Sequence, residues 1–255
     1  MSRRARSFEA DKAILPKIEE LKREHPAWGY RRVWAWLRRR EGLKINHKRV
    51  MRVMKANSLD VRPARSLKAP REAKTHKMRS REPNSLWGTD MTKVMIPSEG
   101  WAYLHVVLDW ASKKLVGWSL SRTSKASDWL AALDSAVAGQ FPHGIKETKP
   151  DGLYLVSDHG SQPTSKAYME AAKALGFCQV FSSYCNPKGN ADTERVIRTI
   201  KEDLVWPRDW SSFGELEGAL GKWIAEYNAL YPHSALGYDT PVEYEQWFIA
   251  AASSQ

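Results

Sequence analysis

The stretch SLWGTDMTKVMIPSEGWAYLHVVLDWASKKLVGWSLS, residues 85–121, contains three β-rich runs in succession. The runs cover residues 85–96, 101–110 and 114–121, and turn residues such as Pro97 and Gly100 stand between the first two. Apolar, β-branched and aromatic residues bounded by turn signals indicate strands. The stretch therefore predicts that a sheet begins here with three strands.

The pattern changes after residue 121. Helical periodicity over 125–138, 165–175 and 192–205 alternates with short strand patterns over 152–157 and 178–181. Three strands followed by helix, strand, helix, strand and helix predict an α/β fold with an antiparallel start and a parallel continuation, which is a mixed five-stranded sheet. Two more helices are expected at 213–229 and 241–251.

The N-terminal region has a different, all-α pattern. Apolar residues recur at helical spacing over 11–24, 30–40 and 47–56, and Asn46 is a suitable N-cap for the third helix. A short helix, a tight turn and a basic helix suggest a helix-turn-helix, with the third helix as reader. Residues 61–83 are rich in Lys, Arg and Pro, lack apolar periodicity, and are interpreted as a linker that can lie along DNA.

Charge divides the chain in the same place. Residues 1–82 hold 25 Lys and Arg against 9 Asp and Glu, whereas the remaining 173 residues hold 15 against 20. A polycation of this density favours a phosphate-rich partner, because neutralised phosphates release condensed counterions. A solvated basic surface or a ribosome-type tail is the alternative that charge alone leaves open.

Composition narrows the class of protein further. Apolar residues make up 42% of the chain, which is ordinary for a soluble globular protein, and no stretch approaches the ~20 apolar residues of a membrane helix. No apolar run follows the basic N-terminus, so we expect no secretory signal. The two cysteines, Cys178 and Cys185, are expected to be reduced thiols in a bacterial cytoplasm, near the nucleoid.

Three acids stand at positions that suit a metal site. Asp90 lies within the first strand, Asp158 just past the fourth, and Glu194 in the first turn of the helix after the fifth. If the first and fourth strands are neighbours, these carboxylates converge, and the later helix brings Glu194 to the pair. Taken singly, Asp158 is equally well a turn residue, and Glu194 an acid that complements the helix dipole.

Clustered carboxylates repel one another unless a cation neutralises them. Oxygen ligands without paired His or Cys indicate a hard ion, Mg²⁺ or Mn²⁺, and two such ions about 4 Å apart can serve phosphoryl transfer. We therefore expect Asp90, Asp158 and Glu194 to be both the metal ligands and the catalytic residues.

The words around these acids resemble a known family. Between Asp158 and Glu194 stand 35 residues, the spacing of the DDE transposase and retroviral integrase superfamily. The matching phrases are His25-Pro26-Ala27-Trp28-Gly29-Tyr30-Arg31-Arg32, Trp87-Gly88-Thr89-Asp90-Met91-Thr92, Ser157-Asp158-His159-Gly160-Ser161-Gln162, Asn190-Ala191-Asp192-Thr193-Glu194, and His233-Ser234-Ala235-Leu236-Gly237-Tyr238 with Pro241. They cover residues 25 to 245 or so, and they resemble the larger reading-frame product (OrfB type) of two-frame bacterial insertion sequences.

This resemblance implies an RNase H-like core, divalent metal, and strand cleavage followed by strand transfer without a covalent enzyme–DNA intermediate. It implies DNA partners (element ends and target), a homo-oligomer on DNA, and a smaller DNA-binding partner from the second frame. The expected domains are a basic helical region (1–60), a linker (61–83), the catalytic core (84–207) and a helical extension (208–255). The chain departs from the family at His159 and Pro163, where Arg and Tyr are frequent.

Basic residues on helices are the expected DNA contacts. Lys201 lies two turns after Glu194 and Arg198 one turn after it, on the same side of the helix. In the family, a basic residue at the Lys201 position resembles one that grips terminal DNA. The other expected contacts are on the N-terminal helices: Arg31, Arg32, Lys48, Arg49 and Arg52.

Other residues near the acids have plainer interpretations. Asp109 is expected to be structural, and a phosphate or proton role for His159 is the minor alternative. Both cysteines lie in the core region, so the His-Cys zinc module of retroviral integrases is not expected.

Two other functions stay open at this point. An RNase H-like nuclease would cut without joining, and a DNA-binding regulator would carry an idle core. RNA binding is the weakest alternative, because no aromatic stacking motif accompanies the charge.

Overall fold

A computed structural model of the chain describes residues 3–61, 80–149, 151–181 and 189–252. The chain forms two compact units, one of Met1–Glu72 with Pro232–Asp239 and one of Ala73–Tyr231 with Thr240–Gln255. Most of the expected linker, residues 62–79, and Cys185 lie outside the described residues. None of the described helices is both long enough and apolar enough to cross a membrane.

The smaller unit is built from the three expected helices, α1 (Arg3–Glu24), α2 (Tyr30–Arg39) and α3 (His47–Ala56). Their apolar stripes form its core, which includes Ile18, Leu21, Val33, Leu37, Val50 and Val53. Asn46 caps α3, since its side chain accepts a hydrogen bond from the Lys48 amide at 2.9 Å. The helix α1 begins at Arg3 rather than at residue 11, because backbone propensity continues the helix beyond its apolar stripe.

A distant segment completes this unit. Residues Pro232–Asp239, with the 3₁₀ turn Ser234–Leu236, belong to it. Tyr238 packs edge-on against Trp34 with ring centroids 5.5 Å apart. Arg39 forms an ion pair with Asp239 and donates to the Gly237 carbonyl at 2.8 Å.

The larger unit contains the mixed five-stranded sheet that the sequence predicts. Its strands are β1 (Leu86–Ile96), β2 (Gly100–Asp109), β3 (Leu115–Ser121), β4 (Leu153–Ser157) and β5 (Phe177–Phe181). Their order is β3-β2-β1-β4-β5. Strand β1 pairs antiparallel with β2 and parallel with β4, so the first and fourth strands are neighbours as expected.

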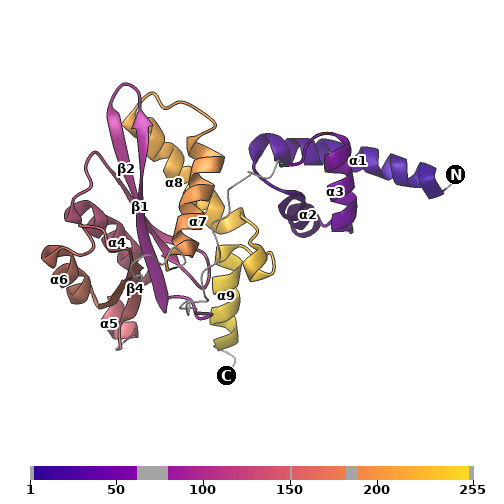
Figure 1. Cartoon of the computed structure of the whole chain (residues 1–255). Coiled ribbons are helices and arrows are strands. Elements are labelled where there is room, and N and C mark those ends of the chain that lie inside the picture. Colours follow the sequence, from indigo (N-terminus) through magenta and orange to yellow (C-terminus); the bar gives the residue numbers. More distant parts are fainter. Residues whose placement is uncertain (1–2, 62–79, 150, 182–188, 253–255) are drawn as a thin grey trace, which may run out of the picture. The chain divides into compact units, whose positions relative to one another are not determined.

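Helices cover both faces of this sheet (Figure 1). On one face, α4 (Ala126–Gln140) packs on β2 and β3 and against α6 (Lys166–Leu175). On the other, α7 (Ala191–Ile200) packs on β1 and β2, and α8 (Phe213–Leu230) lies on β3. A short α5 (Ile145–Thr148), a π-helix (Lys201–Val205) and α9 (Pro241–Ala252) complete the unit.

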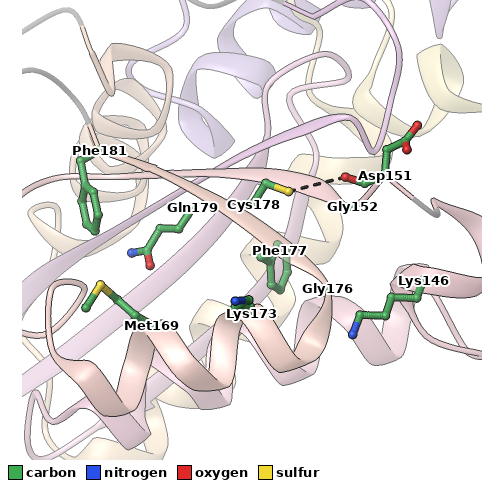
Figure 2. A pocket seen from close by; sticks show the side chains of 10 residues that line it. All are labelled: Lys146, Asp151, Gly152, Met169, Lys173, Gly176, Phe177, Cys178, Gln179 and Phe181. Atoms are coloured by element: carbon green, nitrogen blue, oxygen red, sulfur yellow. Dashed lines mark hydrogen bonds between the residues drawn. The ribbon is translucent and has the colours of Figure 1, made fainter.

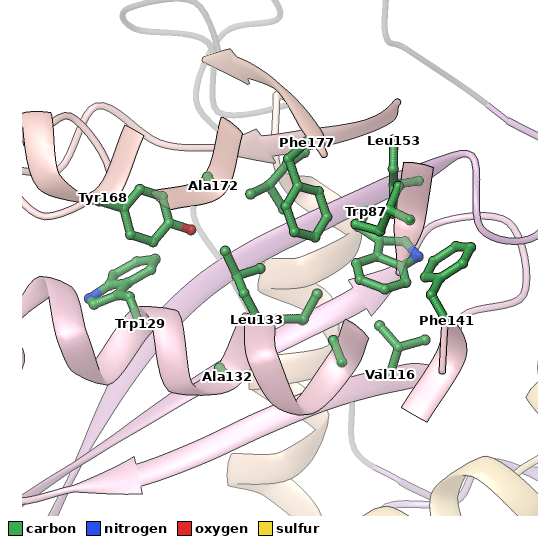
Figure 3. Close-up of a cluster of buried hydrophobic side chains, with 14 residues drawn as sticks. Trp87, Val116, Trp129, Ala132, Leu133, Phe141, Leu153, Tyr168, Ala172 and Phe177 are labelled. Carbon is green, nitrogen blue, oxygen red and sulfur yellow. The ribbon is translucent and has the colours of Figure 1, made fainter. Parts of the chain in front are cut away.

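The main apolar core of the larger unit lies between the sheet and α4 with α6. It includes Trp87, Trp129, Leu133, Tyr168 and Phe177, all nearly or fully buried (Figure 3). Side chains alternate between the faces of a strand. Because Trp87 faces this core, Gly88 and Asp90 face the side that carries α7.

Candidate active site

Asp90 lies near the middle of β1 and is half-buried. Its carboxylate accepts a hydrogen bond from the Met91 backbone amide at 2.7 Å. An acid inside an apolar strand is costly unless a partner or an ion compensates its charge. The position therefore marks Asp90 as the first candidate for a functional role.

Asp158 directly follows β4 and is exposed. The parallel register pairs Gly88 of β1 with Val156 of β4, so Asp90 and Asp158 each stand two residues beyond this pair. One carboxylate oxygen of Asp158 accepts from the Gly160 amide at 3.0 Å, which holds the side chain to its own turn.

Glu194 lies in the first turn of α7, and its backbone amide donates to the Asn190 carbonyl at 3.0 Å. The side chain is exposed. Because α7 packs on β1 and β2, this first turn brings Glu194 to the face of the sheet that carries Asp90.

The acids act on one another electrostatically. Burial, with smaller contributions from the negative charges of Asp158 and Glu194, raises the pKa of Asp90 to about 6, against the Met91 hydrogen bond and the Lys201 charge. Partial desolvation of the otherwise exposed Glu194 carboxylate also raises its pKa above the ordinary value. The charges of Asp158, Glu194 and Lys201 thus all act on Asp90.

The donor set suits a hard divalent cation, because it consists of carboxylate oxygens that repel one another. In the part of the chain that the structure describes, no three His, Cys, Asp or Glu side chains are close enough to hold one metal ion as they stand. The three carboxylates therefore suit a divalent cation by the chemistry of their oxygens and by the elements that direct them toward one another.

The first turn of α7 lies unusually close to β1. A Cβ added at Gly88 would stand 2.3 Å from Thr193 Oγ1 and 2.3 Å from Trp110 Nε1. The Trp110 indole donates to the Thr193 hydroxyl at 3.0 Å, and both side chains are buried. Only glycine leaves room for this approach.

Asn190, the N-cap of α7, spans the same junction. Its side-chain amide donates to the Thr89 carbonyl at 3.0 Å. The sequence assigns no role to Gly88, Asn190 or Thr193 beyond their place in the phrases that resemble the family. The available signals for this junction were Gly88, two positions before Asp90, and Asn190, four positions before Glu194.

Two neighbours of the acids have structural partners. The Asp109 carboxylate is buried and accepts from the Ser112 hydroxyl, the Ser112 amide at 2.9 Å and the Asn84 amide at 3.3 Å, so it is a structural acid as expected. His159 stacks on Phe181 with ring centroids 5.2 Å apart.

The expected DNA contacts are in varied environments. Lys48 is exposed, and Arg31 donates to the Tyr30 hydroxyl at 3.1 Å. Arg49 and Arg52 both form ion pairs with Asp11 of α1, at 2.6 and 2.7 Å.

Arg32 and Arg198, two further expected DNA contacts, also differ in their surroundings. Arg32 is half-buried, and its charge helps to lower the pKa of His25, after the larger effect of burial. Arg198 pairs with Glu202 at 2.7 Å.

A cavity of about 550 Å³ at the β5 edge is separate from the acids. Figure 2 shows residues of α6 and β5 around it, including Lys173 and Gln179. The Cys178 thiol, also in its lining, donates to the Asp151 carbonyl at 3.5 Å. None of the expected site residues lines this cavity.

Comparison with known proteins finds matches in both the N-terminal region and the rest of the chain. An HTH-like domain model matches residues 9–66, and integrase core domain models match residues 80–187 and 177–241. The transposase InsD of insertion element IS2A/D/F/H/I/K from Escherichia coli is 28% identical over 239 residues, which cover 92% of this chain and 78% of the relative. InsD of IS2D from Escherichia coli strain K12 gives the same values.

A solved structure supports the fold. A chain in the cryo-EM structure of the simian T-cell lymphotropic virus intasome, in complex with PP2A regulatory subunit B56 gamma, aligns with a TM-score of 0.53 and 16% identity. The alignment covers 83% of this chain and 73% of that chain.

The two integrase core matches together span residues 80–241, more than half of the 255 residues. The similarity to the InsD transposases extends over most of the chain. The chain is therefore a member of the integrase core family, of the insertion-element transposase type.

Proposed function

We propose that this transposase cleaves and joins DNA strands with divalent metal held by Asp90, Asp158 and Glu194. The observation that carries the proposal is the raised pKa of Asp90, which burial and the charges of Asp158 and Glu194 cause together. Neighbouring carboxylates that repel one another bind a hard cation readily, because the cation neutralises their charges. Mg²⁺ or Mn²⁺, as two ions, would activate the attacking oxygen and stabilise the leaving oxygen of a phosphodiester.

In this proposal the chain's own residues hold the metal and orient the DNA. Asp90 is fixed by β1, and Glu194 by the docking of α7 on that strand. Asp158 supplies a carboxylate from the turn that directly follows β4. The Lys201 ammonium, whose charge reaches Asp90, is suited to a DNA phosphate beside the acids.

We assign the basic helical unit to DNA binding, with residues 1–60 as the DNA-binding region, its third helix as the reader, and 61–83 as the linker. Residues 84–207 form the proposed catalytic core, and 208–255 its extension. The proposed partners are the element ends, target DNA and further copies of this chain, because two ends must be brought together for transfer. A smaller protein from the second reading frame would add end recognition.

The test is strand transfer by the purified chain on a pre-cleaved duplex that carries the element's end, with Mn²⁺ or Mg²⁺. We expect joined products from the wild type and none from Glu194→Gln, because the variant loses a charged ligand without a large change in size. Glu217→Gln is the matched control: it removes an exposed acid of α8 in the same unit, and it should leave transfer unchanged.

The outcomes separate the alternatives. Hydrolysis without joining would indicate a nuclease. Tight DNA binding that is independent of metal, without cleavage even after the smaller reading-frame product is added, would indicate a regulator with an idle core.

A further inference from the structure

Asn190 connects β1, which carries Asp90, with α7, which carries Glu194. Its side chain is 5% exposed. Its amide nitrogen donates to the Thr89 carbonyl in β1, and its backbone carbonyl accepts from the Glu194 amide in α7, each at 3.0 Å. One residue thus bonds to the backbone immediately before Asp90 and to the backbone of Glu194 itself.

The bond from Asn190 to Thr89 lies where β1 and β4 separate in the sheet. The β1–β4 pairing ends at Gly88 and Val156, and Thr89 is the next residue of β1. Here the two strands part, and the acids follow directly at positions 90 and 158. A backbone group at such a point requires a partner, and Asn190 provides it.

The contacts around Asn190 constrain α7 in a complementary way. Gly88, Thr193 and Trp110 determine how closely the helix approaches the strand. Among the described residues, Asn190 Oδ1 is buried and accepts no hydrogen bond, so the side chain is held through its amide nitrogen alone.

We propose that Asn190 is a positioning residue that sets the spacing of Glu194 from Asp90 so that both carboxylates can share a cation. The inference rests on the proposed function of these acids. Side chains that orient metal ligands from behind typically contribute 10- to 100-fold to metal affinity or activity, so loss of this bond should be measurable without DNA.

The experiment measures Mn²⁺ binding to the full chain by calorimetry, in parallel with thermal unfolding and strand transfer. Asn190→Ala removes the bond to Thr89, and Asn190→Ser keeps a polar side chain that is too short to reach that carbonyl. Neither variant removes a capping bond, because the Asn190 side chain makes none to α7. The matched control is Asn228→Ala. The Asn228 side chain joins α8 to β3 away from the acids. Its Oδ1 accepts from the Leu115 backbone amide and its Nδ2 donates to the Leu115 carbonyl, both at 2.9 Å.

We expect both Asn190 variants to weaken Mn²⁺ binding about tenfold and to need correspondingly more Mn²⁺ for transfer. Asn228→Ala should lose comparable thermal stability and keep the wild-type Mn²⁺ affinity. Asn190 variants that lose stability but bind Mn²⁺ like the wild type would overturn the inference and leave Asn190 a structural residue. Wild-type Mn²⁺ binding that Glu194→Gln does not change would instead overturn the carboxylate centre, and the inference with it.

Discussion

His105 is a buried histidine in β2 that is kept neutral by its surroundings. Its side chain is 0% exposed, its Nδ1 lies 3.3 Å from Ser119 Oγ, and its ring centroid lies 5.3 Å from that of Trp129. Burial lowers the pKa of His105 from 6.5 to about 4, against the opposing charge of Asp128. The folded chain therefore takes up this proton less readily than the unfolded chain does.

The stability that depends on His105 is present above pH 6.5 and is lost as the pH falls toward 4, because the unfolded chain is protonated first. Between pH 7.5 and 5 we expect this residue to lower the free energy of unfolding by about 2 kcal/mol. Urea unfolding at both pH values checks this. His105→Gln should be less sensitive to acid than the wild type, and an equal loss in both proteins would contradict the assignment.

Gly88 and Gly218 give opposite expectations for the same substitution. Gly88→Ala places a methyl group against Thr193 and Trp110, and it should destabilise the chain by about 2 kcal/mol or more. Gly218 is exposed in α8 with nothing within 4 Å, so Gly218→Ala should stabilise it by about 0.5–1 kcal/mol. Thermal unfolding measures both. A neutral Gly88→Ala would mean that α7 lies farther from β1.

Single residues differ in how far the sequence could predict them. Asp90, Asp158 and Glu194 could be singled out, because each is an acid at a conspicuous position of a predictable element. Asn190 could not be given its role, because its partner Thr89 lies 101 residues away and no pattern signals such a bond.

At the level of elements, local signals predicted most boundaries. The helix α3 begins after its N-cap Asn46 and ends at Ala56, as the pattern indicates. The helix expected over 192–205 instead divides into α7 and a π-helix from Lys201 to Val205. The sequence could not predict this change of hydrogen bonding, because the same side chains suit both kinds of helix. It also missed the four-residue α5.

The pairing of α1 with α3 yields a prediction on DNA affinity. Asp11 neutralises Arg49 and Arg52, which are expected to face phosphate. Asp11→Asn removes that competition. We expect DNA binding about threefold tighter at low salt, and a steeper dependence of affinity on salt concentration, both measured by fluorescence anisotropy.

A charge-matched control distinguishes the pairing from a general effect. Glu41→Gln removes one acid from the same unit, where Glu41 pairs with Lys17, and leaves the Asp11 pairs in place. Equal gains from both variants would show that net charge alone sets the affinity. No gain from Asp11→Asn would mean that Arg49 and Arg52 do not contact DNA.

At the level of the whole molecule, charge and structure separate the proposed tasks. The basic excess lies in residues 1–82, whereas Asp90, Asp158 and Glu194 all belong to the larger unit. A divalent cation should therefore act on the larger unit, although the smaller one holds most of the excess of basic residues. Sequence composition predicted this separation. It could not predict that residues Pro232–Asp239 belong with the N-terminal helices, because that contact depends on packing between distant segments.

Hydrogen exchange with and without Mn²⁺ tests the separation. A ligand at 100 times its Kd stabilises the native state by about 2.7 kcal/mol. We expect slower exchange in peptides from β1, β4 and α7, because these elements carry the three acids, and no change in α2 or α3. Sodium chloride at equal ionic strength controls for screening, and Glu194→Gln should abolish most of the protection. If Mn²⁺ protected the smaller unit instead, the ion would be bound away from the carboxylates, and the proposed centre would be wrong.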